Sequence, residues 1–207
     1  MFKILLTAGA LALGITGAAH AAIVTNGSFE DAPGFPFNSE GWGIGSLPGW
    51  TNTEGGIEVQ TQLTLNLQPD DGLNYIELDG TRNYEISQLV SLLVGDYNLS
   101  FAYSPRQQDL GTNGIAFSVG SLLNSSVTGP NVLNMTSVGE WTLFTYRFTV
   151  ANAGSYTLAF SGLPVSDSFG GLLDNVAIAA VPVPAAGLLL IGALGGLAVL
   201  RRRRKTA

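Results

Sequence analysis

The middle of this chain alternates apolar and polar residues with a period of two. In residues 97–103, tyrosine, leucine and phenylalanine stand at every second position between asparagine, serine and alanine, and residues 115–119 and 144–150 repeat the pattern. Successive side chains of a strand point to opposite faces of a sheet, so this alternation predicts strands with one buried face. No stretch between Ile23 and Ala180 shows convincing helical periodicity or an internal repeat. The pattern therefore predicts an all-β domain.

Turn-forming residues divide this region into about eight or nine predicted strands. The turn formers include Asp70-Asp71-Gly72 and Asp79-Gly80, and the Gly-, Pro- and aromatic-rich residues 31–56 are predicted to form a long packed loop. Many short strands in one domain of residues 22–180 indicate a single β-sandwich, a jelly roll, whose first and last strands lie near each other. Residues 23–30 are predicted to be a short strand that runs into a turn, and the longest predicted strand is Trp141 to Val150. The remaining predicted strands are residues 57–60, 73–79, 84–91, 156–160 and 172–179.

The first 21 residues have the three parts of a secretory signal peptide. Lys3 supplies the charged start, residues 4–17 are apolar, and Ala19-His20-Ala21 is a small-x-small cleavage site. We therefore expect residues 1–21 to be removed on export through the inner membrane, with cleavage after Ala21.

A proline-rich motif near the other end is followed by an apolar run and a cluster of cations. The motif is Val181-Pro182-Val183-Pro184-Ala185, and the apolar run extends from Ala185 through Leu188 to Leu200. These 16 residues would form a helix of about 24 Å, somewhat short of a hydrocarbon core of about 30 Å. The prolines cannot continue a helix backward and mark its start. A stop-transfer end on the cytoplasmic side is predicted by the cations Arg201, Arg202, Arg203, Arg204 and Lys205.

The layout of residues 181–207 resembles the PEP-CTERM class of bacterial sorting signals, and the proline motif is similar to its VPLPA variant. The resemblance implies recognition by an exosortase-type membrane enzyme and cleavage near the prolines. The upstream domain would then be released or transferred to the cell surface or an extracellular polymer. The sequence departs from the family twice, since it has no Pro-Glu-Pro and Val183 replaces the variant's leucine. The alternative is an ordinary single-span anchor that is never processed.

Without these two ends, residues 22–180 are strongly acidic and lack most catalytic side chains. They keep 3 basic residues, Arg82, Arg106 and Arg147, against 15 acidic ones, which gives a formal charge of −12. Such a charge repels phosphate backbones, so we expect no nucleic acid partner. His20 leaves with the signal peptide, and this region has no cysteine or lysine. A histidine base, a thiolate nucleophile, a Schiff-base lysine and a His/Cys zinc site are therefore excluded, and we assign no catalytic residue.

Two motifs at the ends of the predicted domain resemble those of galactose-binding-like jelly-roll domains and, more distantly, carbohydrate-binding modules of similar fold. They are Asn26-Gly27-Ser28-Phe29-Glu30 and Leu173-Asp174-Asn175-Val176, and residues 48–50, 71–80 and 86–88 add to the resemblance. In such domains the glutamate of the first motif and the aspartate of the second often share a structural Ca²⁺. The resemblance thus implies that Glu30 and Asp174 bind calcium, with backbone carbonyls near Asn26.

Carboxylates in excess are compatible with a calcium ion, which takes about six to eight oxygen ligands. The alternative is purely structural: Asn26 and Gly27 form a turn, Phe29 packs in the core, and Glu30 is solvated. We expect no other cofactor.

Aromatic residues in predicted loops are candidates for a sugar-binding platform, because pyranose faces stack on Trp and Tyr. These ligand candidates are Trp42, Trp50, Tyr84 and Arg106. The alternative for a tryptophan in a Pro-Gly-Trp turn is to plug the end of the core, and for an isolated arginine it is a structural ion pair.

The sequence thus predicts an exported, exosortase-sorted protein of the cell surface or extracellular matrix, held in the membrane transiently or permanently. Its non-enzymatic β-sandwich would associate with exopolysaccharide. One alternative is a lectin-like module with a defined glycan ligand. Another is a small carboxylate-based glycan hydrolase; Glu77 and Asp79 would share a strand face, but proximity in sequence supplies no cleft.

Overall fold

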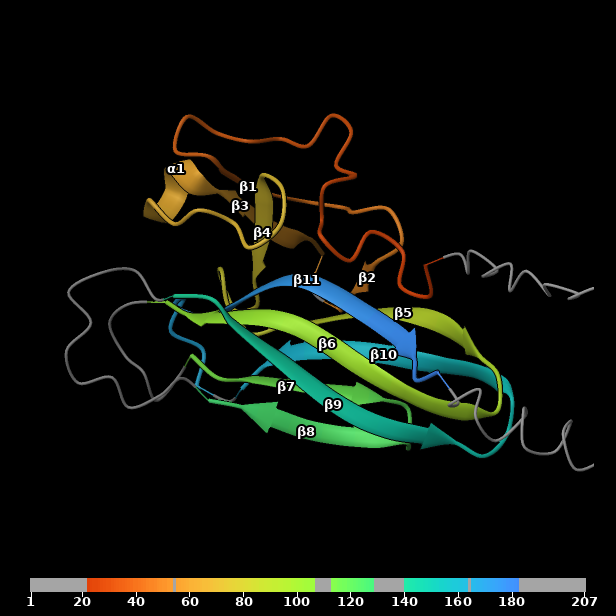
Figure 1. Cartoon of the computed structure of the whole chain (residues 1–207). Coiled ribbons are helices and arrows are strands. Elements are labelled where there is room, and N and C mark those ends of the chain that lie inside the picture. The colour runs from red at the N-terminus through yellow and green to blue at the C-terminus, as the bar shows by residue number, and fades with distance from the viewer. Residues whose placement is uncertain (1–21, 54, 107–112, 129–139, 164, 183–207) are drawn as a thin grey trace, which may run out of the picture.

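Two antiparallel β-sheets pack face to face in the computed structural model, which describes residues 22–53, 55–106, 113–128, 140–163 and 165–182 (Figure 1). The six-stranded sheet has the order β1 (Trp42–Gly45), β3 (Ile57–Thr61), β4 (Asn74–Glu77), β11 (Gly171–Ala180), β6 (Gly95–Pro105) and β9 (Thr142–Val150). The five-stranded sheet has the order β2 (Thr51–Asn52), β5 (Glu85–Leu92), β10 (Gly154–Gly162), β7 (Ile115–Val119) and β8 (Leu123–Val127). The prediction of an all-β sandwich is confirmed.

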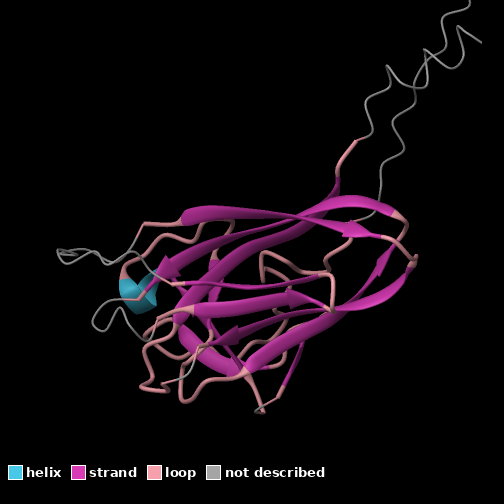
Figure 2. Cartoon of the chain, turned by 90° about the horizontal axis from the view of Figure 1, so that it is seen from below, coloured by secondary structure: helices cyan, strands magenta, loops and turns pink. Residues whose placement is uncertain are grey.

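A single helical turn, α1 (Gln62–Leu65), interrupts the strands of the described region (Figure 2). The side chain of Thr61 caps it by accepting the Leu63 N–H at 3.3 Å, and Asn66 ends it in the left-handed conformation. Both residue types are favoured at these helix ends because they satisfy backbone groups or tolerate positive φ.

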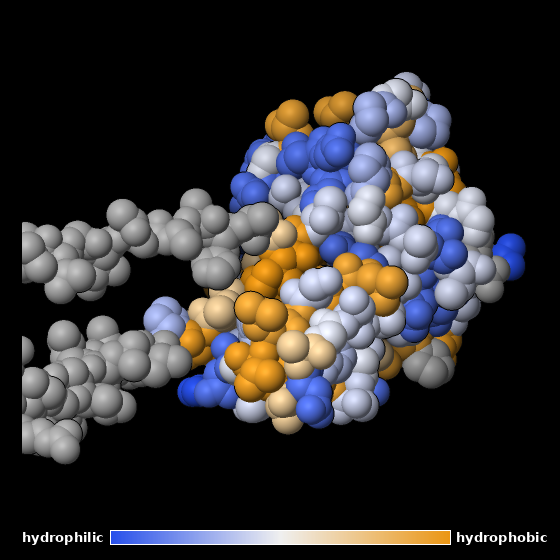
Figure 3. All heavy atoms as spheres, turned by 90° about the vertical axis from the view of Figure 1, so that its right-hand side faces the viewer, coloured by the Kyte–Doolittle hydropathy of each residue, from blue (hydrophilic) through white to orange (hydrophobic). Residues whose placement is uncertain are grey.

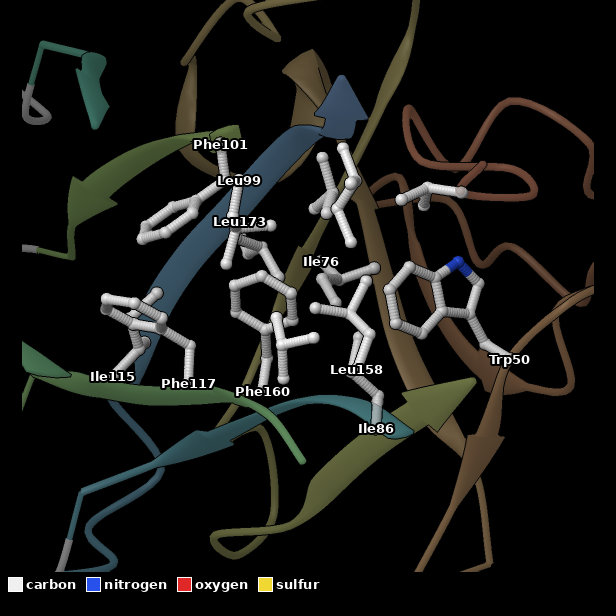
Figure 4. Packing of buried hydrophobic residues seen from close by; sticks show 14 of the residues in the cluster. Trp50, Ile76, Ile86, Leu99, Phe101, Ile115, Phe117, Leu158, Phe160 and Leu173 are labelled. Atoms are coloured by element: carbon white, nitrogen blue, oxygen red, sulfur yellow. The ribbon is translucent and has the colours of Figure 1, made fainter. Parts of the chain in front are cut away.

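Aromatic rings from both sheets fill the space between them (Figure 4). Phe101 of β6 meets Phe117 of β7 and Phe160 of β10 edge-on, with ring centroids 4.9 Å and 5.2 Å away. Edge-to-face pairs at such distances add to the stabilisation that apolar burial provides. The period-two pattern of residues 97–103 is thus explained, because alternate residues of β6 point into this core.

Residues 23–30 were predicted to be a short strand that runs into a turn; the turn is present, but the segment contains no strand and consists of bends and turns. Asn26 and Phe29 have φ values of 50° and 61°, which are incompatible with an extended strand. The segment nevertheless lies beside the last strand, as expected, since Val176 N–H donates to the Gly27 carbonyl at 2.8 Å.

Two further differences concern strands that the sequence pattern did not predict. The segment expected to be a packed loop, residues 31–56, contains the short strands β1 and β2. Strand β8 also escaped prediction because its sequence, Leu-Asn-Ser-Ser-Val, has polar residues at its centre and pairs with β7 at the edge of its sheet. An edge strand with little buried surface carries no strong alternation.

The first and last described residues lie at the same end of the sandwich (Figure 1). Beyond the end of β11, Val181 N–H donates to the Asp96 carbonyl at 2.8 Å, next to the turn that connects β5 of one sheet to β6 of the other. No helix within the described residues is long and apolar enough to cross a membrane. The predicted signal peptide, residues 1–21, and the predicted anchor with Val183, Pro184, Ala185, Leu188, Leu200 and Arg201–Arg204 lie outside the described residues.

Candidate functional site

Buried carboxylates lie on the outer face of the six-stranded sheet, opposite the main core. Glu58 of β3 pairs across the ladder with Glu77 of β4, next to the pair Val59 and Ile76. Because side chains alternate, Val59 and Ile76 enter the core while Glu58, Gln60 and Glu77 point to the other face. The cross-strand register therefore places two acids side by side, where like charges destabilise each other unless other groups compensate.

Glu77 is fully buried and is the hub of this polar network. Its carboxylate accepts hydrogen bonds from Arg106 Nη1 at 2.6 Å, from the Gly170 N–H at 2.8 Å and from Gln60 Nε2. Burial raises the pKa of Glu77 to about 7, although the hydrogen bond and charge of Arg106 oppose the rise. The network thus supplies donors to a charge that burial would otherwise disfavour.

Arg106, a predicted ligand candidate, is engaged by neighbours in the structure. Besides the ion pair with Glu77, its guanidinium lies 5.0 Å from the centroid of the Phe169 ring and donates to the Ser168 carbonyl at 3.3 Å. Planar guanidinium groups suit such combined stacking and ion pairing. This geometry fits the alternative of a structural ion pair that fastens the β10–β11 loop.

Asp79 also holds the β10–β11 loop in place through hydrogen bonds. Its carboxylate accepts hydrogen bonds from the Ser166 hydroxyl at 2.7 Å and from the N–H groups of Asp167 at 2.8 Å and Ser168 at 3.2 Å. Together Glu77 and Asp79 use their oxygens to fix the backbone of residues 166–170. A carboxylate that accepts several backbone N–H bonds is a rigid loop anchor.

A pocket with a volume of about 230 Å³ opens beside this network. Glu58 lines this pocket and is 7% exposed. Burial raises the pKa of its carboxyl, although the hydrogen bond from Gln60 opposes the rise. Gln60 Nε2 donates to its Oε1 at 2.8 Å. The pocket is lined by Ile44, Gly55, Gly56, Glu58, Thr81, Arg82 and Tyr84. The lining thus combines an apolar wall, a carboxylate and a cation.

Glycines make room for the side chains of Glu58 and Ile44 in the lining of the pocket. A methyl group at Gly80 would lie 1.8 Å from Oε2 of Glu58, and one at Gly56 would lie 2.2 Å from Cγ2 of Ile44. Any larger residue at either position would displace a side chain that lines the pocket. The shape of the pocket therefore depends on these two glycines.

Tyr84, another ligand candidate, lines the pocket but is only 6% exposed. Its hydroxyl accepts the Glu58 N–H at 3.1 Å and donates to the Glu77 carbonyl. The ring is buried in the main core, and burial raises the pKa of the phenol. Tyr84 thus holds β3 and β4 together at the floor of the pocket.

The two tryptophan candidates occupy different environments. Trp50 is buried, its Nε1 donates to the Asn26 carbonyl at 2.9 Å, and its ring centroid lies 5.7 Å from that of Phe29. Trp42 is half-buried in β1 and donates from Nε1 to Glu40 Oε2 at 3.1 Å. Trp50 therefore matches the alternative of a core plug, although it also lines a second hollow of about 270 Å³ together with Gly45, Ser46, Thr51, Asn52 and Ile57.

The candidate calcium residues come together at one loop. Glu30 Oε1 accepts the N–H groups of Leu73 at 2.9 Å and Asn74 at 2.8 Å, and Asp174 Oδ2 accepts the Asp71 N–H at 3.0 Å. Asp174 is fully buried, and burial raises the pKa of its carboxyl to about 7. A buried carboxylate with a raised pKa gains from a neighbouring cation, so Asp174 suits a hard metal ion, whereas Glu30 is exposed and could offer only a carboxylate oxygen.

Asn26 fits this role less well. Its backbone carbonyl already accepts hydrogen bonds from Trp50 Nε1 at 2.9 Å and from the Phe29 N–H at 3.3 Å, which occupies both of its lone pairs. Among the described residues, no three carboxylate, histidine or cysteine side chains gather as a metal-binding group. A cation here would take its remaining ligands from backbone oxygens or water.

Sequence reasoning missed Glu58 as a pocket residue, and it assigned Arg82, like the other two arginines of the domain, to structural ion pairing. Glu58 follows the apolar Ile57 and precedes Val59, so the pattern marks it as the outward residue of a strand and nothing more. Its proximity to Arg82 and Thr81 arises from the β4–β5 turn, which the sequence does not position.

The two-sheet fold of this chain is similar to that of a solved protein structure. No protein-family model matches the chain. TmCBM61, solved in complex with β-1,4-galactotriose, matches with a TM-score of 0.50 at 17% identity, over 78% of this chain and 100% of that module. The chain shares its fold with carbohydrate-binding modules. A family 35 carbohydrate-binding module from Clostridium thermocellum matches at 13% identity and a TM-score of 0.44, over 67% of this chain and 97% of that module.

One protein with a similar sequence is much larger than this chain. Halomucin of Haloquadratum walsbyi is 28% identical over 183 residues, which cover 84% of this chain. The chain spans 2% of the length of halomucin.

Proposed function

We propose that residues 22–180 form a non-catalytic domain that binds polysaccharide through the pocket lined by Glu58 and Arg82. The observation that carries this proposal is the pocket itself, which sets a carboxylate and a guanidinium beside the apolar side chain of Ile44. Sugars present hydroxyl groups and apolar ring faces together, so a binding site needs convergent polar groups on an apolar wall. The fold that TmCBM61 shares with this chain supports the assignment.

The volume of the pocket suits one sugar unit of a longer chain. About 230 Å³ lies just below the range of about 300–1,000 Å³ usual for small-molecule sites. Hydrogen bonds hold Glu58 in one position before a ligand binds. Gln60 donates to its carboxylate, and the Tyr84 hydroxyl accepts its backbone N–H. A pre-positioned acceptor loses little entropy on binding.

The carboxylates favour binding over hydrolysis. Glycoside hydrolysis needs two carboxyl groups about 5 to 10 Å apart across a cleft. Glu58 is the carboxylate among the residues that line the pocket, while Glu77 and Asp79 hold the β10–β11 loop. The domain would therefore retain a glycan without cleaving it.

The metal and sorting roles complete the proposal. One Ca²⁺ bound by Glu30 and Asp174 would clamp the loop of residues 70–74 against β11. Residues 1–21 would direct export, and residues 181–207 would anchor the protein until an exosortase-type enzyme cleaves near Val181-Pro182-Val183-Pro184. The protein would then act at the cell surface or in an extracellular matrix.

Titration of purified protein with soluble polysaccharides, including β-1,4-galactan, tests the binding role. We expect saturable binding that weakens about tenfold or more in Glu58→Gln, which corresponds to a loss of about 1.4 kcal/mol. Glu140→Gln removes an exposed charge away from the pocket lining and serves as the control. Equal affinity of Glu58→Gln and wild type, or no saturable binding to any polysaccharide, contradicts the proposal. Intact mass of protein from cells and medium tests sorting separately, since retained Arg201–Lys205 would indicate a permanent anchor.

A further inference from the structure

The sandwich ends in an apolar tip at the side where the chain leaves β11. Leu93 and Val94 form the β5–β6 turn and are 70% and 66% exposed. Leu89, on the outer face of β5, is also exposed, and Figure 3 looks onto this end and shows apolar residues gathered there. We call Leu93 and Val94, with the neighbouring turn of residues 151–153 and residues 181–182, the apolar tip.

Charge is nearly absent from this tip, although the domain is strongly acidic. Residues 88–97, 148–158 and 176–182 contain one carboxylate, Asp96, and no cation. Asp96 is compensated by Arg147 Nη2 at 2.7 Å and the Thr149 hydroxyl at 2.6 Å. The tip is therefore a part of the described surface that an anionic lipid headgroup layer would repel little.

The backbone N–H and C=O groups of Leu93, in this turn, have hydrogen-bond partners within the protein and so do not depend on water. Leu93 N–H donates to the Tyr97 hydroxyl at 3.2 Å, and that hydroxyl donates to the Leu93 carbonyl at 3.1 Å. Tyr97 is itself fixed, because its ring stacks on Phe148 with centroids 5.7 Å apart. Unsatisfied backbone groups are what makes a turn costly in lipid, and the Tyr97 hydroxyl satisfies both backbone groups of Leu93.

The tether between the tip and the apolar run is short. Val181 N–H is bound to the Asp96 carbonyl, and Pro182 is the last described residue. Three residue steps separate Pro182 from Ala185, so their Cα atoms lie at most about 11 Å apart. If residues 185–200 enter the bilayer, the tip must lie at or near the headgroup layer, whose two sides together add about 10–15 Å to the hydrocarbon core.

We propose that the apolar tip docks on the lipid bilayer, with Leu93 and Val94 inserted in the headgroup region. The proposal rests on the anchoring part of the proposed function and not on glycan binding. The docked domain would stand upright on the membrane, with the pocket lined by Glu58 and Arg82 toward the opposite end of the strands. The tip would also hold the proline motif at the membrane surface, where a membrane enzyme could reach it.

Lipid-borne quenchers test this contact in the full chain. The sequence contains no cysteine, so Leu93→Cys, Val94→Cys and Leu63→Cys each give a single labelling site for an environment-sensitive fluorophore. Leu63 lies in α1 and is 76% exposed, which makes it an aliphatic control of similar exposure. Each variant is reconstituted in phosphatidylcholine–phosphatidylglycerol vesicles with a nitroxide quencher at the headgroup. A Leu188→Cys label reports insertion of the apolar run.

We expect blue-shifted emission and at least about twofold stronger quenching for labels at 93 and 94 than at 63. Equal quenching at all three positions would overturn the proposal. So would a blue shift that depends on protein concentration and not on quencher lipid, which would indicate a second copy of the chain on the tip. Absence of quenching at 188 would also overturn the proposal, because the apolar run would then not hold the tip at the membrane. Polysaccharide titration would still decide the glycan role.

Discussion

Glu30 and Asp174 come from opposite ends of the domain, yet both accept hydrogen bonds from the backbone of the loop of residues 70–74. Glu30 binds the N–H groups of Leu73 and Asn74, and Asp174 binds the N–H of Asp71. The loop is thereby fixed between the N-terminal turn and β11 by two carboxylates. A methyl group at Gly72 would lie 2.4 Å from the Glu30 carboxyl carbon, so the loop must approach closely.

Calcium should stabilise the protein through this arrangement. We expect Ca²⁺ to raise Tm and excess EDTA to lower it, and Asp174→Asn should abolish most of the difference because it removes a charged ligand. Differential scanning calorimetry measures the shift. Asp96→Asn is the matched control, since Asp96 is a half-exposed acid paired with Arg147. An unchanged melt in EDTA would count against calcium.

Gly27→Ala should destabilise the fold by more than about 2 kcal/mol. A Cβ at Gly27 would lie 1.9 Å from the Val176 carbonyl oxygen, so the N-terminal turn would have to separate from β11. Gly154→Ala is the control, because its Cβ would meet an atom of Tyr156 at an ordinary 3.9 Å. Urea unfolding of the two variants should differ; equal midpoints would show that the turn can shift cheaply.

Trp50→Ala should cost about 3–5 kcal/mol of unfolding free energy, as expected for a large buried side chain. Trp42→Ala should cost markedly less, since Trp42 is half-buried and its Nε1 bonds the nearby Glu40. Chemical denaturation followed by tyrosine fluorescence and circular dichroism compares them. A larger loss for Trp42 would reverse the assignment of Trp50 as the core plug.

Stability should depend on pH through Glu77. Burial raises the folded-state pKa of Glu77 to about 7, above its ordinary value of about 4.3. The folded state therefore binds this proton more tightly than the unfolded state, and Glu77 makes stability fall as pH rises from about 4.5 to 7, by at most about 1.4 kcal/mol per pH unit.

Glu77→Gln should remove this contribution, so the variant should show a flatter pH profile than wild type. Asp174 adds a slope of the same sign, and the test is therefore the difference between the two profiles. Glu85→Gln, an exposed acid, should leave the slope unchanged. Parallel profiles of wild type and Glu77→Gln would mean that Arg106 keeps Glu77 ionised in the folded state.

Strands with strong alternation could be predicted from sequence alone. Residues 97–103 and 115–119 each have a side chain large enough to fill the core at every second position, and both form strands, β6 and β7. The short strand predicted at the start of residues 23–30 is absent, while the turn predicted after it is present: Asn26 and Phe29 adopt positive φ in a turn fixed by contacts with β11. Local pattern does not report such distant contacts.

The sequence by itself determined the all-β class, the excess of carboxylates and the pairing of two motifs at the ends of the domain, because periodicity, composition and short motifs are local properties. Only the tertiary structure decided which polar residues meet. It joined Glu58 and Arg82 in one pocket, assigned Arg106 and Asp79 to one loop, buried Trp50, and placed Leu93 and Val94 beside the exit of β11. The physical reason is that strand order and register, set by packing of the two sheets, bring together residues far apart in the chain.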